Sequence, residues 1–93
     1  MRDLHRPYEV RIRPSAEREF RSLPGDVQAR LKAALLHLAQ DPRPPTAAKL
    51  VAAQGWRVRV GDYRVGYEID DAERVVTIGA VGHRREFYRR IRR

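Results

Sequence analysis

The 93-residue sequence contains no cysteine. This absence excludes disulfide bonds, cysteine-ligated zinc sites and thiol nucleophiles, and it is compatible with a reducing compartment. No apolar run approaches the roughly 20 residues that a membrane-spanning helix needs. The first residues also lack the cationic and then apolar pattern of a secretory leader. We therefore expect a cytoplasmic protein with no membrane partner.

Lysine is scarce, although the chain is strongly basic. Only two of the 20 basic residues are lysine, and 12 acidic residues leave a formal net charge of +8. The guanidinium group of arginine is planar, donates paired hydrogen bonds to phosphate oxygens and stacks on nucleobases. A general preference for arginine over lysine would explain their ratio but not the excess of positive charge. The composition therefore predicts a polyanionic partner, either nucleic acid or an acidic protein.

Hydrophobic periodicity predicts one strand near the N-terminus. Residues 1–7 are expected to form a loose arm, and residues 8–13 alternate apolar and polar side chains. Alternation with a period of two places every second side chain on the same face of a strand. The core face of this strand is predicted to carry Tyr8, Val10 and Ile12.

Two helices are predicted to follow this strand. Ser15 is the expected N-cap of the first helix, and Pro24-Gly25 ends it. Asp26 is the expected cap of the second helix, which extends to about Gln40 and ends before a proline-rich loop. Apolar residues at helical spacing predict one buried face on each helix. These residues are Ala16, Phe20 and Leu23 in the first helix, and Val27, Leu31, Ala34, Leu35 and Leu38 in the second.

Two adjoining segments in the second half alternate apolar and polar residues with a period of two. They are residues 56–60 and 63–70, and Gly61-Asp62 between them predicts a tight turn. In such a hairpin the apolar side chains share one face and the polar side chains share the other. The polar face is predicted to carry Arg57, Arg59, Arg64 and Glu68. Three guanidinium groups on one small surface are suited to binding phosphate, and Glu68 is expected to pair with one of them.

A third strand of this sheet is predicted for residues 74–82. Gly66 and Gly79 then fall on the face away from the core. Their missing side chains either leave open space on this polar face, or the two glycines mark bulges and close backbone contacts. The remaining segment, residues 83–93, is basic and is expected to form a short helix or a frayed tail. The core face of the third strand is predicted to carry Val76, Ile78 and Ala80.

The order of these elements defines an α+β fold in one domain that spans residues 1–93. Strand, helix, helix and three strands are expected to form a small antiparallel sheet with the two-helix hairpin packed on one face. Residues 47–54 are expected to connect the helices to the hairpin, and a short basic helix completes the chain.

Two motifs resemble the RelE branch of the RelE/ParE toxin superfamily. One is the hairpin segment, residues 56–70, and the other is Val81-Gly-His-Arg-Arg-Glu-Phe-Tyr88. The similarity extends from Tyr8 to about Arg90, and it is more specific for the superfamily than for the target of the toxin. It implies the toxin of a bacterial type II toxin–antitoxin system that cleaves messenger RNA, typically in the ribosomal A site.

The reaction of that family needs neither a metal nor another cofactor. The ribose 2′-hydroxyl attacks the neighbouring phosphorus, which leaves a cyclic phosphate and a free 5′-hydroxyl. Such a reaction requires a base for the 2′-hydroxyl, cations for the phosphorane and an acid for the departing oxygen. The resemblance therefore implies an endoribonuclease that inhibits translation.

The resemblance also assigns roles to individual residues. Arg57 and Arg59 correspond to basic strand residues that are lysines in the best-known pattern, where one lysine is thought to act as the base. Arg64 corresponds to an arginine that stabilises the transition state. Arg84 corresponds to an arginine linked with protonation of the leaving group, and Tyr88 to a tyrosine that stacks on or orients the reacting nucleotide. The expected contacts to the RNA backbone are Lys49, Arg85 and Arg89.

Arginine at positions 57 and 59 leaves the identity of the general base open. A guanidinium with a pKa above about 12 has almost no neutral fraction at pH 7, so it is a poor proton acceptor. His83 has a suitable ordinary pKa, and the adjacent charge of Arg84 would favour its neutral form. Related toxins use a histidine near this point. The base is therefore a strongly perturbed arginine, His83, or no protein group, with weak or ribosome-assisted catalysis.

Two further functions are compatible with the same fold, because function depends on the site. A ParE-like protein would inhibit DNA gyrase, although ParE-like chains usually lack the complete basic set and the tyrosine. An inactive homologue would act mainly as the partner of an antitoxin. All three hypotheses imply a cognate RelB-like antitoxin, for which the net charge predicts an acidic, partly disordered segment. The resemblance implies that this antitoxin covers the basic face or displaces the C-terminal helix, and that operator DNA is bound only through it.

Overall fold

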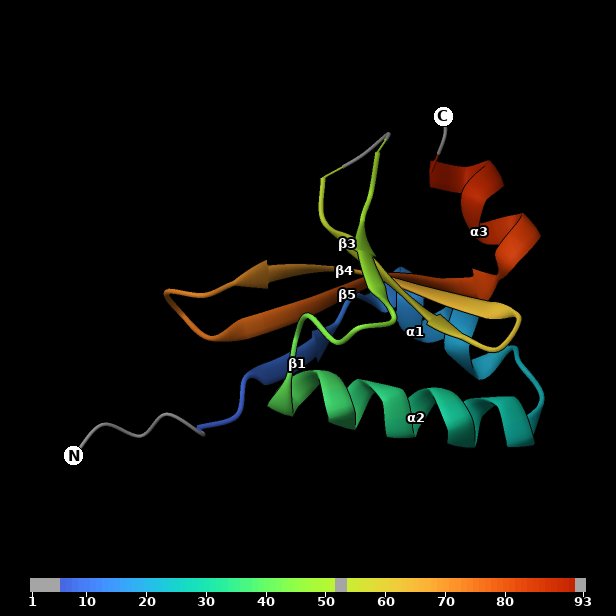
Figure 1. Cartoon of the computed structure of the whole chain (residues 1–93). Coiled ribbons are helices and arrows are strands. Elements are labelled where there is room, and N and C mark those ends of the chain that lie inside the picture. Colours follow the sequence, from blue (N-terminus) through green and yellow to red (C-terminus); the bar gives the residue numbers. More distant parts are fainter. Residues whose placement is uncertain (1–5, 52–53, 92–93) are drawn as a thin grey trace.

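The elements of the chain follow the order strand, helix, helix, four strands and helix (Figure 1). The computed structural model describes residues 6–51 and 54–91, so most of the predicted N-terminal arm lies outside the described residues. No helix of these two ranges is long and apolar enough to span a membrane. The elements are β1 (Glu9–Ile12), α1 (Pro14–Arg21), α2 (Gly25–Gln40), β2 (Ala47–Lys49), β3 (Trp56–Val60), β4 (Tyr63–Asp70), β5 (Val75–His83) and α3 (Arg84–Ile91).

The strands form one sheet in the order β1-β5-β4-β3-β2. The predicted α+β fold is confirmed, and β3, β4 and β5 pair antiparallel as expected. The sheet is nevertheless mixed, because β1 pairs parallel to β5 at its edge. A short additional strand, β2, extends the other edge by pairing antiparallel with β3. The connector predicted for residues 47–54 therefore contains a strand, whose three residues are too few to show an alternating pattern.

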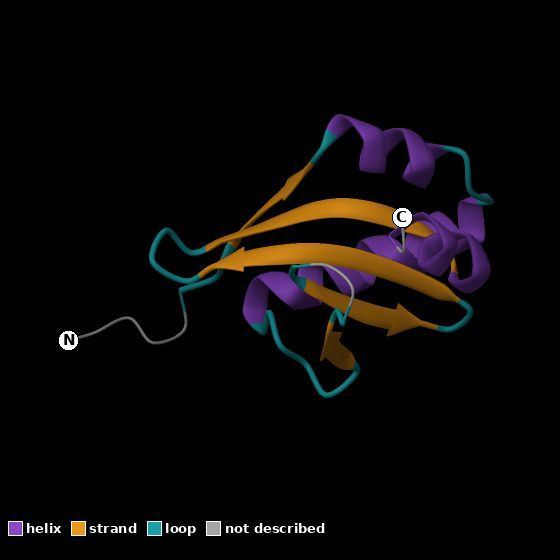
Figure 2. Cartoon of the chain, turned by 90° about the horizontal axis from the view of Figure 1, so that it is seen from above, coloured by secondary structure: helices purple, strands orange, loops and turns teal. Residues whose placement is uncertain are grey.

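The helices cover the two faces of the sheet unequally. Both α1 and α2 pack on one face, and α3 lies on the other face above β4 and β5 (Figure 1). Seen from above, the long strands run side by side across the molecule, and α2 passes beneath them (Figure 2). The sheet therefore has a core face, which is covered by α1 and α2, and a second face on which only α3 is packed.

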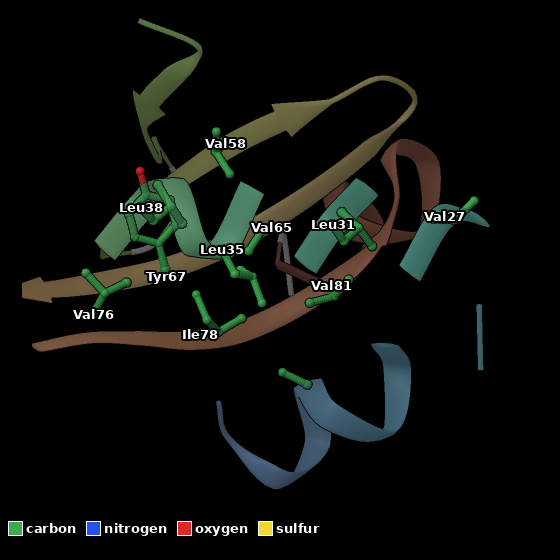
Figure 3. Packing of buried hydrophobic residues seen from close by; sticks show 11 residues of the cluster. Val27, Leu31, Leu35, Leu38, Val58, Val65, Tyr67, Val76, Ile78 and Val81 are labelled. Atoms are coloured by element: carbon green, nitrogen blue, oxygen red, sulfur yellow. The ribbon is translucent and has the colours of Figure 1, made fainter. Parts of the chain in front are cut away.

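The core lies between α2 and the sheet (Figure 3). The predicted stripe of α2 is confirmed, because Leu31 and Leu38 are almost fully buried and Val27 and Leu35 are buried as well. Ala16 of α1 is fully buried in the same cluster. The sheet contributes side chains that alternate along its strands, as the period of two requires. These side chains are Val58, Val65, Tyr67, Val76, Ile78 and Val81.

A bulge in β5 changes which side chains reach the core. Gly66 lies opposite Ala80, but the next residue, Tyr67, lies opposite Ile78, so Gly79 is an extra residue in β5. One extra residue reverses the alternation that follows it. The prediction that Ala80 faces the core is therefore wrong, and Val81 occupies the core instead. Of the two alternatives for Gly79, the structure supports the bulge.

Three local predictions are also wrong. Ile12 was expected in the core but is 40% exposed, because it lies on the short edge strand β1 near the end of the sheet. The N-cap positions of the helices are Arg13 and Pro24 instead of Ser15 and Asp26, and neither makes a side-chain capping bond. Pro14 accounts for the earlier start of α1, since proline is preorganised for the first turn and needs no hydrogen-bond acceptor there.

A polar network closes the end of the sheet at the β4–β5 turn. The guanidinium of Arg43 donates hydrogen bonds of 3.2 and 2.8 Å to the carboxylate of Asp71. The hydroxyl of Tyr8 donates another, 2.6 Å long, to the same carboxylate. These bonds, first from Arg43 and then from Tyr8, lower the pKa of Asp71 to about 2.

We expect the network of Asp71 to make stability depend on pH in the acid range. The pKa is lower in the folded state than in the unfolded state, so the ionised carboxylate stabilises the fold above about pH 4 and this stabilisation is lost towards pH 2. Asp71→Asn should therefore lower the urea midpoint at pH 7. Between pH 4 and pH 2, the urea midpoint of this variant should decrease less than that of the wild type. The matched control is Glu73→Gln, an exposed acid in the same turn. An unchanged pH profile in Asp71→Asn would contradict this expectation.

Candidate functional site

Three arginines lie together on the face of the sheet away from the core. The hairpin register places Arg59 directly opposite Arg64, and Arg57 opposite Gly66. Residues directly opposite each other in an antiparallel pair share a face, with Cβ atoms roughly 5 Å apart. The predicted hairpin and its faces are therefore confirmed. We call Arg57, Arg59 and Arg64 the arginine face.

Backbone carbonyls orient two of these guanidinium groups. Nη1 of Arg64 donates to the carbonyl oxygens of Gly61 and Tyr63, at 3.0 and 2.9 Å, while its buried Nε has no partner. Nη1 of Arg57 donates to the carbonyl of Thr46 at 3.3 Å. The side chain of Arg59 is exposed. Because carbonyl groups are neutral, they hold the guanidinium groups without cancelling their charge.

The arginine face has no acidic partner in the described part of the chain. The ion pairs identified there join Arg11 to Glu9, Arg21 to Glu17 and Arg43 to Asp71, and none of them reaches this face. The expected pair between Glu68 and Arg57 or Arg59 is not among them, although Glu68 lies on the same side of β4. The face therefore keeps its positive charge available for an anionic ligand.

The C-terminal helix α3 adds further cations to this side of the molecule. Its first residue, Arg84, donates its backbone N–H to the carbonyl of Asp62 at 2.8 Å, so the helix begins at the hairpin turn. Arg84, Arg85 and Arg89 are exposed, and Tyr88 is half-buried. These four side chains line a hollow of about 550 Å³. The predicted C-terminal helix is confirmed, and it packs on β5 and β4 on the same side of the sheet as the arginine face.

His83 does not share the arginine face. It lies opposite Tyr63 in the sheet, whereas Gly82 lies opposite Arg64. Since Tyr63 belongs to the core side of β4, His83 shares that side, and the two rings contact edge to face with centroids 5.6 Å apart. Its Nδ1 accepts the backbone N–H of Arg85 at 3.4 Å. The structure therefore separates His83 from the arginines with which a general base would have to act.

Lys49 also lies apart from the predicted site. It is opposite Trp56, at the edge strand β2, and its Nζ lies 5.9 Å from the centroid of the indole ring. The guanidinium carbon of Arg43 lies 5.3 Å from the same ring. Cations near an aromatic ring interact favourably with its electrons. Lys49 thus belongs to a cluster around Trp56 on the other face of the sheet from Arg57.

Two arginines near the site were not among the predicted site residues. Arg13 lies with its Cδ 3.9 Å from the position of a Cβ at Gly79, and it lines a pocket of about 180 Å³ together with Gly66 and Phe87. The alternation of residues 8–13 could have indicated Arg13, since it falls on the polar face of that strand. Nη2 of Arg30, from α2, lies 2.7 Å from the position of a Cβ at Gly61. No local sequence pattern indicates Arg30. This side chain reaches the hairpin turn only because α2 packs against the sheet.

The chemistry available at this site is that of fixed positive charge. Guanidinium groups can bind phosphate and stabilise added negative charge, but they accept protons poorly. Within residues 6–51 and 54–91, no three histidine, aspartate or glutamate side chains are grouped so that they could hold a metal ion. The arrangement is therefore suited to binding a phosphodiester and stabilising its more highly charged transition state.

Comparison with known proteins places the chain in a family. The model of the ParE toxin of the type II toxin–antitoxin system parDE matches residues 10–88. The toxin RelG of Mycobacterium tuberculosis is 35% identical over 86 residues, which cover 90% of this chain and 99% of RelG. The matches thus extend over almost the whole chain.

Solved structures show the same fold. The toxin–antitoxin complex RelBE2 from Mycobacterium tuberculosis matches with a TM-score of 0.78 and 31% identity, over 89% of this chain and 98% of that one. The archaeal RelE–RelB complex from Pyrococcus horikoshii matches with a TM-score of 0.75 and 27% identity, over 84% and 96%. The isolated RelE toxin of E. coli matches with a TM-score of 0.67 and 27% identity, over 90% and 98%. The chain therefore belongs to the RelE/ParE superfamily and is the toxin of a type II toxin–antitoxin system.

Proposed function

We propose that this toxin is an endoribonuclease of the RelE type, which cleaves messenger RNA in the ribosomal A site and thereby inhibits translation. One observation carries the proposal. Arg57, Arg59 and Arg64 project from the hairpin on the face that α3 covers, and no ion pair identified in the described part of the chain neutralises them. Arg84 and Tyr88 come from that same helix. A surface of this kind is suited to a phosphodiester in a way that a single exposed arginine is not.

The proposed roles follow from the position of each group. Arg59 and Arg64 lie opposite each other, so their guanidinium groups can bind the non-bridging oxygens of one phosphate and stabilise the phosphorane. Arg84, at the start of α3, donates a hydrogen bond to the departing 5′-oxygen. Tyr88 stacks on the nucleotide, while Arg85 and Arg89 contact the RNA backbone. Lys49 lies beside Trp56 on the other face of the sheet, so it contacts only RNA that extends past the edge of the sheet to that face.

The placement of His83 bears on the general base. Its position on the Tyr63 side of the sheet disfavours direct proton transfer from a ribose bound at Arg59 and Arg64. Of the three alternatives, we favour the one in which no side chain of the toxin is a strong base. In that mechanism, the guanidinium groups lower the barrier mainly by stabilising charge, and the ribosome assists removal of the proton.

The proposed antitoxin is a RelB-type protein with an acidic segment. The complexes from Mycobacterium tuberculosis and Pyrococcus horikoshii support this partner, because each contains a toxin of this fold bound to its antitoxin. The charge of +8 and the arginine face, which has no ion-pair partner among residues 6–51 and 54–91, favour an acidic segment that neutralises the toxin by covering the face or by displacing α3. We further propose a cytoplasmic location, with operator DNA bound through the antitoxin alone.

The proposal is tested by translation in a cell-free system that is read by primer extension. Purified toxin should cut the message at codon boundaries when ribosomes translate it, and should leave the same RNA intact when ribosomes are omitted. The upstream fragments should end in a 2′,3′-cyclic phosphate, which an end-group assay detects. Intact message at catalytic concentrations of toxin would contradict the proposal.

A gyrase inhibitor is the second candidate, and the match to the ParE family model favours it. The discriminating assay is supercoiling by purified DNA gyrase in the presence of toxin. Trapped DNA breaks together with unaffected translation would replace the ribonuclease proposal. Overexpression of the unpaired chain without any harm to the cell would instead indicate an inactive homologue.

A further inference from the structure

We infer that Phe87 is a positioning residue, which packs on Gly66 and thereby holds Tyr88 and Arg84 of α3 over the arginine face. The inference rests on the proposed ribonuclease function and deepens it. It assigns a role to two residues that contact no substrate in the proposed mechanism. Phe87 supplies the apolar contact that fixes the helix, and Gly66 supplies the space that this contact needs.

The burial of Phe87 distinguishes it from its neighbours in α3. Its side chain is fully buried, whereas Arg84, Arg85, Glu86 and Arg89 are exposed. It is not part of the main core cluster, because α3 lies on the opposite face of the sheet from α1 and α2. Among residues 84–89, Phe87 is therefore the only buried side chain that attaches this basic helix to the sheet.

The contact with Gly66 is so close that a larger residue would require the Phe87 ring to shift. A Cβ at position 66 would lie 3.0 Å from Cε1 and 3.1 Å from Cζ of the Phe87 ring. Both distances are shorter than ordinary van der Waals contact between carbon atoms. Gly66 lies between Arg57 of β3 and Ala80 of β5 in the sheet. The ring of Phe87 thus rests on the middle of the surface from which the strand arginines project.

Two further contacts connect this anchor to the proposed site. The N–H of Arg84 is bonded to the carbonyl of Asp62, which fixes the start of the helix at the hairpin turn. The ring of Tyr88 packs edge to face on Phe87, with centroids 5.2 Å apart and an interplanar angle of 83°. Because the helix is held at its start and at Phe87, a shift of the Phe87 ring displaces Tyr88 relative to Arg59 and Arg64.

The test compares two glycine-to-alanine substitutions on the same face of the sheet. In Gly66→Ala the added methyl group meets the Phe87 ring, whereas in Gly79→Ala the nearest atoms, of Arg13, lie 3.9 and 4.0 Å away. Misplacement of a reacting group by about 1 Å can cost roughly 100-fold in rate. The added methyl group requires the Phe87 ring to shift by a few tenths of an ångström. We therefore expect Gly66→Ala to lower the single-turnover rate of ribosome-dependent cleavage by about 3- to 10-fold, and Gly79→Ala to change it by less than about twofold.

Binding to the ribosome separates positioning from loss of affinity. All the arginines remain in Gly66→Ala, so its dissociation constant for programmed ribosomes should stay within about twofold of wild type. Phe87→Leu removes the ring contact with Tyr88, keeps an apolar anchor and serves as a milder second variant. The double variant Gly66→Ala/Phe87→Leu should recover part of the rate lost in Gly66→Ala, because the smaller side chain makes room for the methyl group.

Amide hydrogen exchange of the toxin tests the contact between Phe87 and Gly66 without a measurement of RNA cleavage. Residues of α3 should lose protection in Gly66→Ala and keep it in Gly79→Ala, while α2 stays protected in both. A full cleavage rate in Gly66→Ala, a loss that appears only as weaker ribosome binding, or equal exchange in the two variants would overturn the inference. If wild-type toxin cleaves no RNA, the proposed function fails, whereas the exchange experiment still decides whether Phe87 and Gly66 hold the helix.

Discussion

Arg64→Ala is expected to reduce ribosome-dependent cleavage of messenger RNA by roughly 10²- to 10³-fold, which is the usual effect of removing one donor that stabilises transition-state charge. Arg64 is half-buried, and two carbonyl groups hold its guanidinium in place. Preorganised charge of this kind needs no rearrangement during the reaction. The measurement is the single-turnover rate in the cell-free translation assay, with growth arrest on expression as a second reading.

Two control variants separate charge, geometry and folding at position 64. Arg64→Lys keeps the positive charge but loses the planar fork of donors, so it should recover only part of the rate. Arg21→Ala removes an exposed arginine that is paired with Glu17 on α1, and it should cleave like wild type. The thermal midpoint of Arg64→Ala should change little, because water can bond to the carbonyl oxygens of Gly61 and Tyr63 at the hairpin turn in place of the guanidinium. Full activity of Arg64→Ala would contradict the role proposed for this residue.

Leu31→Ala is expected to lower the free energy of unfolding by about 2–5 kcal/mol, the range measured for buried leucines. Leu31 is 1% exposed and belongs to the stripe of α2 that packs on the sheet. Truncation removes apolar contacts and leaves a cavity, while alanine itself remains favourable in a helix. In a domain of this size, each 1 kcal/mol shifts the thermal midpoint by roughly 4–8 °C. Urea unfolding and differential scanning calorimetry measure the two quantities.

The matched control for Leu31→Ala lies on the same helix. Leu36 is 65% exposed, so Leu36→Ala makes the same chemical change without opening a cavity. Its free energy of unfolding should remain within about 0.5 kcal/mol of wild type. If both variants lost the same free energy of unfolding, leucine would stabilise α2 through its helix propensity and not through burial. That result would contradict the assignment of the core to one face of this helix.

The hairpin and the stripe of α2 could both be predicted because each depends on a short repeating pattern. Side chains alternate along a strand with a period of two, so the faces of β3 and β4 follow once the turn at Gly61-Asp62 is recognised. The spacing of Val27, Leu31, Leu35 and Leu38 similarly defines one side of a helix. Both inferences need only residues that are close in sequence.

The errors arose where a pattern is interrupted or a pairing is distant. The bulge at Gly79 reverses the alternation of β5, so Ala80 and Val81 exchange the faces that strict periodicity assigns to them. The same reversal places His83 on the side of Tyr63, away from Arg64. The parallel pairing of β1 with β5 joins segments that are more than 60 residues apart, and the residues between them contain no local signal for it.

By itself, the sequence determined the local elements, the arginine face of the hairpin and the resemblance to the superfamily, since these depend on neighbouring residues and motifs. Only the tertiary structure decided which residues share the site. It packs α3 against β5 and β4, places Phe87 on Gly66, adds Arg13 and leaves His83 and Lys49 on the other face. The physical reason is that packing between distant segments, and one extra residue in a strand, determine where side chains point in space.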